Sequence, residues 1–397
     1  MNIRQTMLIL LMAFGCQQVF SQEESSKGNN ILSNSEVDAR WRKTEIKVKN
    51  GGQSPNVVTL LRAFHQALPT WVVGEVLKQN DHPAKGTKRD GLVLILESDE
   101  EDEMTIIIDP VNGYAEYSSV TDIDQMSCCV WRRSNGHRIF AVSLYEQHDP
   151  VQNLLCWYDY DPQTQTMKAE KSPIDKYKKP FEKMDFSWSL PRKGTDFVIT
   201  EYYYFPDEAN VTQVFSWDGM EHHYAKTLIG DFKYQYFDDE DWYQASKQGF
   251  TEFDLVDLDN SGSPVICLKK DDINWLVLGE FRGEMQTVAV NDEMHQIEGF
   301  FHVKPEADAP WTEKDLVAYT SDFMHTHYYA ILQEGSIGYF VTDEPETDDE
   351  GNTIGYTPKI NGYGAKDESI HIIHASVADK MTLKPQWRKF EFMTKKE

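Results

Sequence analysis

Short apolar runs alternate with tight-turn signals between residues 90 and 290, and this pattern constrains the fold more than any other feature. Three stretches share one order of parts: a strand, a glycine turn, a second strand, a third strand ending in an aromatic residue, a tight turn and a last strand. Gly136, Gly194 and Gly262 mark the glycine turns, and a truncated earlier copy follows Gly91. Such turns between alternating runs are hairpin signals, and four strands in tandem units are typical of β-propeller blades.

We therefore predict an all-β fold of tandem four-stranded antiparallel units, β-propeller-like, with a short N-terminal helical element. A sandwich of generic hairpins is the alternative. For the first helix, Ser54 is the expected cap and Pro55 suits the first position. Residues 71–77 fit either a second helix or a strand. The apolar stripe of the first helix consists of Val57, Leu61, Phe64 and Leu68.

The N-terminus has the order of parts of a secretory signal. Arg4 is the only charge before residue 23, an apolar run covers residues 7–15, and the small residue Ser21 precedes the expected cut. We therefore expect an exported protein, in the periplasm, on the outer surface or outside the cell. Attachment to a membrane as a lipoprotein through Cys16 is the alternative, although Ala13 stands where a lipobox usually has leucine.

The predicted organisation has five parts. They are a signal peptide (1–21), a flexible leader (22–50), the helical element (51–89), the propeller-like repeats (90–290) and C-terminal hairpins (291–397) that close the ring or form a small separate domain.

The charge balance restricts the partners. The chain has 39 Lys and Arg against 65 Asp and Glu, a formal net charge of −26. This field repels phosphate backbones, so we expect no nucleic-acid partner. No apolar stretch reaches the ~20 residues that span a bilayer, so we also expect no transmembrane segment.

Cysteine usage favours free thiols over disulfides. Cys128 and Cys129 are adjacent, so on a strand they point to opposite faces. The predicted strands separate both from Cys156 by one whole strand, which exceeds the ~7 Å reach of a disulfide. We therefore expect buried free thiols, including Cys267.

The segment 257–265 is the most informative local motif. Oxygen-bearing residues at alternate positions with a glycine at the sixth make a loop that can wrap Ca²⁺. Over residues 253–281 the sequence resembles FG-GAP/VCBS-type propeller repeats, in which an apolar strand enters such a turn and leaves as a strand. The resemblance implies a structural calcium ion, with a turn held by aspartate side chains as the alternative. It implies these ligands: Asp257, Asp259 and Ser261 through side chains, and Ser263 through its carbonyl.

Two further groups are candidate sites. His325 and His327 share a strand face and, with His371 and His374 from another strand, have the residue types of a zinc site. The acidic run 238–241 before Trp242 is either a solvated loop or an acid-plus-aromatic edge that faces a ligand. No nucleophile elbow, zinc-protease motif or phosphate-binding glycine loop occurs.

Repeats without catalytic motifs favour a binding protein. We expect an exported, non-catalytic binding or interaction protein of the bacterial envelope or exterior, with a glycan or an envelope protein as partner. The alternative is a hydrolase that acts on polysaccharide through carboxylates on several loops.

Overall fold

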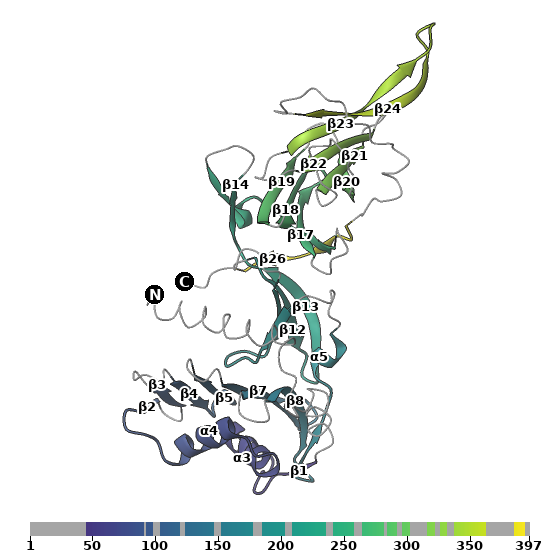
Figure 1. Cartoon of the computed structure of the whole chain (residues 1–397). Helices are drawn as coiled ribbons and strands as arrows, with labels where there is room; N and C mark the ends of the chain where they lie inside the picture. The colour runs from purple at the N-terminus through teal and green to yellow at the C-terminus, as the bar shows by residue number, and fades with distance from the viewer. Residues whose placement is uncertain are drawn as a thin grey trace, which may run out of the picture. The chain divides into compact units, whose positions relative to one another are not determined.

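The fold is mostly strands in antiparallel sheets (Figure 1), which confirms the all-β prediction. The chain divides into two compact units. The first comprises Met1–Lys178, Ser187–Ile199 and Val214–Ala225, and the second comprises Lys179–Phe186, Thr200–Gln213 and Lys226–Glu397. A computed structural model describes residues 45–90, 93–97, 104–119, 124–146, 152–177, 185–202, 209–235, 241–257, 264–281, 284–291, 296–301, 316–321, 326–331, 337–362 and 385–393.

A nine-stranded sheet forms the framework of the first unit. Eight of its strands follow one another along the chain as antiparallel neighbours, and β1 pairs with the last of them. Its strands are β1 (Ile46–Lys47), β2 (Lys88–Asp90), β3 (Val93–Glu97), β4 (Met104–Asp109), β5 (Tyr114–Ser119), β6 (Gln125–Arg132), β7 (Arg138–Glu146), β8 (Gln152–Asp161) and β9 (Thr166–Ala169).

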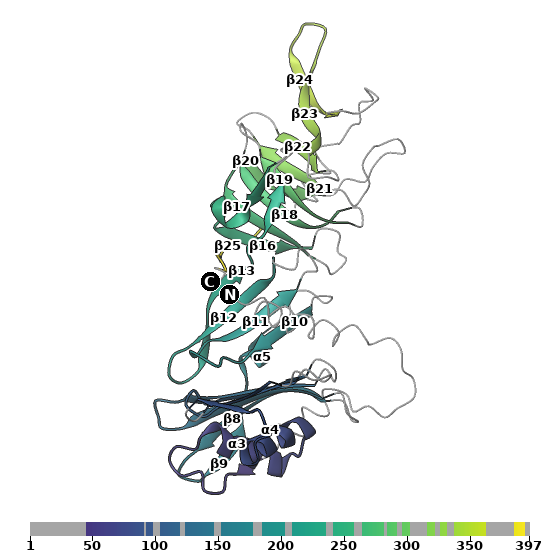
Figure 2. The same cartoon turned by 90° about the vertical axis from the view of Figure 1, so that its left-hand side faces the viewer.

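Two helices cover one face of this sheet, as Figures 1 and 2 show: α3 (Val57–Ala67) and α4 (Trp71–Asp81). The whole predicted stripe of α3 is buried. Phe64 meets Phe140 and Tyr158 edge-on, with ring centroids 6.2 and 6.0 Å apart, so the stripe packs on the middle of the sheet. A shorter helix, α5 (Pro173–Lys176), follows β9.

The cap of α3 differs from the prediction. Asn56, not Ser54, caps the helix, because its side-chain oxygen accepts a hydrogen bond from the Thr59 amide at 2.9 Å. Pro55 therefore precedes the cap instead of occupying the first position. The ambiguous segment 71–77 is helical and belongs to α4.

The first predicted repeat is not a separate blade. Its four strands are β6 to β9, but β5, which the sequence analysis did not predict, pairs with β6 and joins them to the truncated copy. Across the described residues no closed propeller ring is found. The registers of β6, β7 and β8 place Cys128 opposite Val142 and Val142 opposite Cys156. The four described cysteines are buried and free, as predicted.

The second and third repeats each form four consecutive strands of a five-stranded sheet. The division between the units falls within the second repeat. Its strands are β10 (Asp185–Ser189), β11 (Phe197–Tyr202), β12 (Val211–Trp217) and β13 (His222–Ile229), with β26 (Glu391–Phe392) at the edge. The third has β16 (Glu252–Val256), β17 (Val265–Asp271), β18 (Asn274–Phe281) and β19 (Glu284–Asn291), with β25 (Arg388–Lys389) at the edge.

The second unit contains two further sheets. One is the two-stranded hairpin of β14 (Lys233–Gln235) and β15 (Trp242–Gln244), followed by the 3-10 turn η1 (Ala245–Lys247). The other ends in a long two-stranded ribbon, visible in Figure 2, and its strands are β20 (Gln296–Phe301), β21 (Leu316–Ser321), β22 (Thr326–Ile331), β23 (Ile337–Thr347) and β24 (Thr353–Gly362).

Candidate functional site

Aromatic side chains gather on the face of the nine-stranded sheet opposite the helices. Trp131 and Trp157, both buried, stack with ring centroids 4.9 Å apart and planes inclined by 25°. Trp217 lies 6.1 Å from Trp131, and the His222 ring meets Trp131 edge-on at 4.7 Å. Since β8, β6 and the β12–β13 hairpin each supply a ring, the cluster joins three segments of the first unit.

One backbone carbonyl orients two of these rings. The indole nitrogen of Trp131 donates a hydrogen bond to the Thr195 oxygen at 3.0 Å, and His222 Nε2 lies 3.0 Å from the same oxygen. An acceptor at that position requires the proton on Nε2. Burial lowers the pKa of His222, so the ring is neutral near neutral pH.

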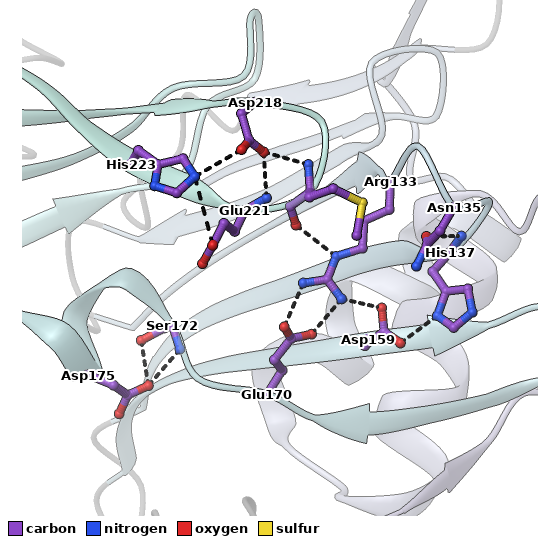
Figure 3. Close-up of polar contacts among 11 residues, drawn as sticks. Arg133, Asn135, His137, Asp159, Glu170, Ser172, Asp175, Asp218, Glu221 and His223 are labelled. Atoms are coloured by element: carbon purple, nitrogen blue, oxygen red, sulfur yellow. Dashed lines mark hydrogen bonds and ion pairs between the residues drawn. The ribbon is translucent and has the colours of Figure 1, made fainter.

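Arg133 clamps the turn between β6 and β7 to its neighbours (Figure 3). Its guanidinium donates to Asp159 at 2.7 Å and forms a fork with Glu170 at 2.6 and 2.8 Å. Its Nε donates to the Met220 carbonyl at 2.8 Å. The Arg133 side chain is only 12% exposed. These hydrogen bonds use four of its five N–H donors inside the protein.

A histidine extends this cluster. His137 Nδ1 lies 2.7 Å from Asp159 (Figure 3). His137 Nε2 lies 3.9 Å from Asp161. The side chain of Asn135 accepts a hydrogen bond from the His137 amide at 3.0 Å, which fixes the turn that carries the histidine. Gly136 in this turn has a φ of 89°, as its predicted turn role requires.

The turn between β12 and β13 meets the β6–β7 turn. Asp218 accepts hydrogen bonds from the backbone amides of Glu221 and Met220, and His223 Nε2 lies 2.9 Å from it. The two backbone amides, with His223, lower the pKa of Asp218 to about 2. The Ser134 amide donates to the Gly219 carbonyl at 2.8 Å. This backbone hydrogen bond and the Arg133 side chain together hold the two turns against each other.

A second titratable group lies on the face of the sheet that carries the aromatic cluster, on β5 beside β6. Burial raises the pKa of Glu116, which accepts a hydrogen bond from the Tyr114 hydroxyl at 3.0 Å. Burial also acts to raise the pKa of Asp109. Hydrogen bonds from Asn112 and Arg192 outweigh this effect, so the pKa of Asp109 is lowered. Carboxylates with pKa values moved in opposite directions are a known feature of acid–base sites.

The charged cluster around Arg133 has a structural role. Asp159 and Glu170 are both engaged by one guanidinium, so this cluster serves as a structural clamp. Within the described residues no group of three or more histidine, cysteine, aspartate or glutamate side chains has the arrangement of a metal site. No helix in the described part of the chain is long and apolar enough to cross a membrane.

Most sequence-predicted site residues lie outside the described residues. This applies to the signal segment with Cys16, to three of the four calcium-loop residues and to the acids 238–240. Asp257 directly follows β16, and His327 lies in β22. The residues outside the description also include Asp259, Ser261, Ser263, His325, His371 and His374.

Trp242 is the predicted site residue about which the structure says most. It opens β15, its exposed fraction is 66%, and Asp241 beside it is also exposed. Sequence analysis missed Arg133, Glu116 and Asp109. Arg133 and Asp109 have partners 87 and 83 residues away in the chain, and burial raises the pKa of Glu116, so only the folded structure shows these environments.

The register of the third repeat bears on the calcium loop. Val256 lies opposite Val265 in an antiparallel pair, so the segment between them connects neighbouring strands of a hairpin.

A comparison with protein-family models finds none that matches the chain, and a comparison with curated proteins finds no similar sequence.

Proposed function

We propose that this chain is an exported, non-catalytic binding protein of the bacterial envelope or exterior, and that Trp242 forms part of its contact surface for a glycan. The exposed fraction of Trp242, 66%, carries the proposal. Large exposed aromatic side chains are more informative than scattered aliphatic ones, since a flat ring with a polar edge suits contacts that combine stacking with hydrogen bonding.

The base of the Trp242 hairpin is held in place. Tyr234 and Tyr243 lie side by side across the two strands, with ring centroids 6.1 Å apart. The Asp231 carboxylate accepts hydrogen bonds from the backbone amide and hydroxyl of Ser246 at 3.0 and 2.8 Å. An aromatic residue on a supported hairpin loses little conformational freedom on binding, which favours recognition.

Trp242→Ala tests this proposal. A glycan array and a pull-down from envelope extracts should identify a ligand of the wild-type chain, and the variant should bind it about tenfold more weakly, the effect of losing one stacking contact. Tyr224→Ala is the matched control, because Tyr224 is 55% exposed but belongs to the first unit. Empty results from both screens, or equal binding by Trp242→Ala, would remove the proposal's support. Capture of a protein only would replace the glycan by a protein partner.

We also propose that the loop beginning at Asp257 binds a structural calcium ion. The pairing of β16 with β17 supports this, because it makes the segment a strand connection of the kind that the resemblance requires. Millimolar calcium should then raise the melting temperature relative to chelator, and Asp257→Asn should abolish the difference. An unchanged melting temperature would rule the ion out.

A second candidate function is polysaccharide hydrolysis, and the opposite pKa shifts of Glu116 and Asp109 favour it. Glu116 would act as general acid and Asp109 as the ionised partner. Release of reducing sugar from a polysaccharide panel should then fall about 100-fold or more in Glu116→Gln, while Glu75→Gln on the surface of α4 retains it. If the wild-type chain releases no sugar from any member, the hydrolase hypothesis fails.

A further inference from the structure

Two arginines stand directly opposite each other in the nine-stranded sheet. Arg132 on β6 pairs with Arg138 on β7. Like charges placed directly across two strands repel each other. Among the described residues no carboxylate lies within ion-pair distance of either guanidinium, although the chain has 65 acids against 39 basic residues. The repulsion is therefore uncompensated in the described part of the chain.

Arg138 is also incompletely hydrogen-bonded. Its Nη2 donates to the Ser54 hydroxyl, but its buried Nε has no hydrogen-bond partner. Burial, followed by the charge of Arg132, lowers the pKa of Arg138. Buried N–H donors without acceptors are rare in native proteins and call for a missing partner.

The loop that carries Ser54 is fitted closely to the sheet. Tyr160, opposite Arg138 on β8, donates its hydroxyl to the Gly52 carbonyl at 2.7 Å. A Cβ added at Gly51 would overlap the Tyr160 hydroxyl, so only glycine fits there. Ser54 is therefore held beside the arginine pair by its own loop.

Asn56, two residues after Ser54 in the chain, lies in the wall of a polar groove. The groove has a volume of about 380 Å³ and also includes Thr59 and Gln66 in its wall. Lys49 and Arg62 contribute positive charge, although Asp81 neutralises Arg62 through a two-pronged ion pair. Amide, hydroxyl and ammonium groups of this kind form hydrogen bonds with sugar hydroxyls and acidic substituents.

We propose that Arg132 and Arg138, with the Ser54 hydroxyl, bind an oxyanion substituent of an acidic glycan, and that the neighbouring groove receives the adjoining sugar. An oxyanion between the two guanidinium groups accepts hydrogen bonds from their terminal N–H groups and screens their repulsion. The site belongs to the first unit and is independent of the Trp242 surface in the second.

The test uses calorimetric titration at constant ionic strength with sodium sulfate, a sulfated glycosaminoglycan hexasaccharide and an uncharged hexasaccharide. The sulfated sugar should bind at least about tenfold more tightly than sulfate, and Arg132→Gln should weaken its binding about tenfold or more. Arg89→Gln is the control for loss of one charge, since Arg89 is exposed on β2. Gln66→Ala should weaken the hexasaccharide but not sulfate.

The variants separate the possible failures. Arg132 is exposed, so its replacement should leave the fold intact, and Ser54→Ala perturbs the site without changing the charge. Equal binding by wild type, Arg132→Gln and Ser54→Ala overturns the oxyanion site. Sulfate binding without a gain for the hexasaccharide overturns the glycan assignment. Trp242→Ala should bind the sulfated sugar at this site as wild type does, so failure of the Trp242 proposal would leave this result unchanged.

Discussion

Replacing Arg133 by alanine should destabilise the first unit more than any other change to a charged side chain described above. The substitution removes four hydrogen bonds that join the β6–β7 turn to Asp159, Glu170 and the Met220 carbonyl. The two carboxylates would remain beside each other without their shared cation. The loss therefore combines missing hydrogen bonds with new repulsion.

The magnitude follows from the exposure of the partners. Removing one partner of a fully buried ion pair costs about 3 to 5 kcal/mol. The side chains of Asp159 and Glu170 are 22% and 36% exposed, so water compensates part of the loss. We expect a fall of about 2 to 3 kcal/mol in the free energy of unfolding. For a unit of this size that corresponds to roughly 4 to 12 °C in melting temperature.

Thermal melts followed by near-ultraviolet circular dichroism measure the effect, because the stacked pair Trp131 and Trp157 reports on the same unit. Arg132→Ala is the matched control: its side chain is exposed and takes part in no ion pair among the described residues, so it should melt within about 2 °C of wild type. Arg133→Lys should fall between the two, since one ammonium cannot replace the fork. A melting temperature for Arg133→Ala equal to that of Arg132→Ala would refute the clamp.

Three further predictions concern burial. Because the pKa of His222 is lowered in the folded state, the unfolded chain takes up more protons, and stability should fall as pH drops from about 7 to about 5. His222→Gln, which can keep a donor to the Thr195 oxygen, should reduce this dependence of stability on pH in calorimetric melts. An unchanged pH dependence would contradict the assignment. In a Cys16→Ser chain the buried thiols should resist Ellman's reagent until unfolding, since burial raises the pKa of Cys128 to about 12, and rapid labelling of the native chain would contradict this. Gly279→Ala should destabilise the second unit by about 1 to 3 kcal/mol, because the new Cβ overlaps the Val265 side chain; Val265→Ala should rescue it in denaturant melts, and failure of the rescue would exclude that contact as the cause.

Local patterns predicted the strands better than the sheets. The runs that meet at Gly136, Gly194 and Gly219 are hairpins, and each of these glycines has a positive φ, because the turn chemistry is local. The continuous nine-stranded sheet was not predicted, since β5 has the sequence YAEYSS, which lacks a clear alternation of apolar and polar residues. The helix cap was misplaced by two residues for a related reason: Ser54 and Asn56 are both good caps, and the contact of Ser54 with Arg138 is not visible in the sequence.

The candidate sites show a similar division. The acids beside Trp242 predicted either a solvated loop or an edge that faces a ligand, because an aromatic residue beside acids is a local signal. Arg133 has its partners 26, 37 and 87 residues away, so only the folded sheet brings them together. The repulsion between Arg132 and Arg138 depends on the strand register. A shift of the register by one residue would place the two side chains on opposite faces and abolish the repulsion.

The edge strands β25 and β26 have a consequence for how the second unit is made. Residues 388–392 pair with β16 on one sheet and with β13 on another, and the Gln386 amide donates to Asp254, 132 residues earlier in the chain. During synthesis both sheet edges therefore exist long before the segment that covers them, and open edges invite pairing with other chains. Residues 385–393 thus act late in folding, and a chain cut before them would retain its core sheets while gaining two surfaces for aggregation.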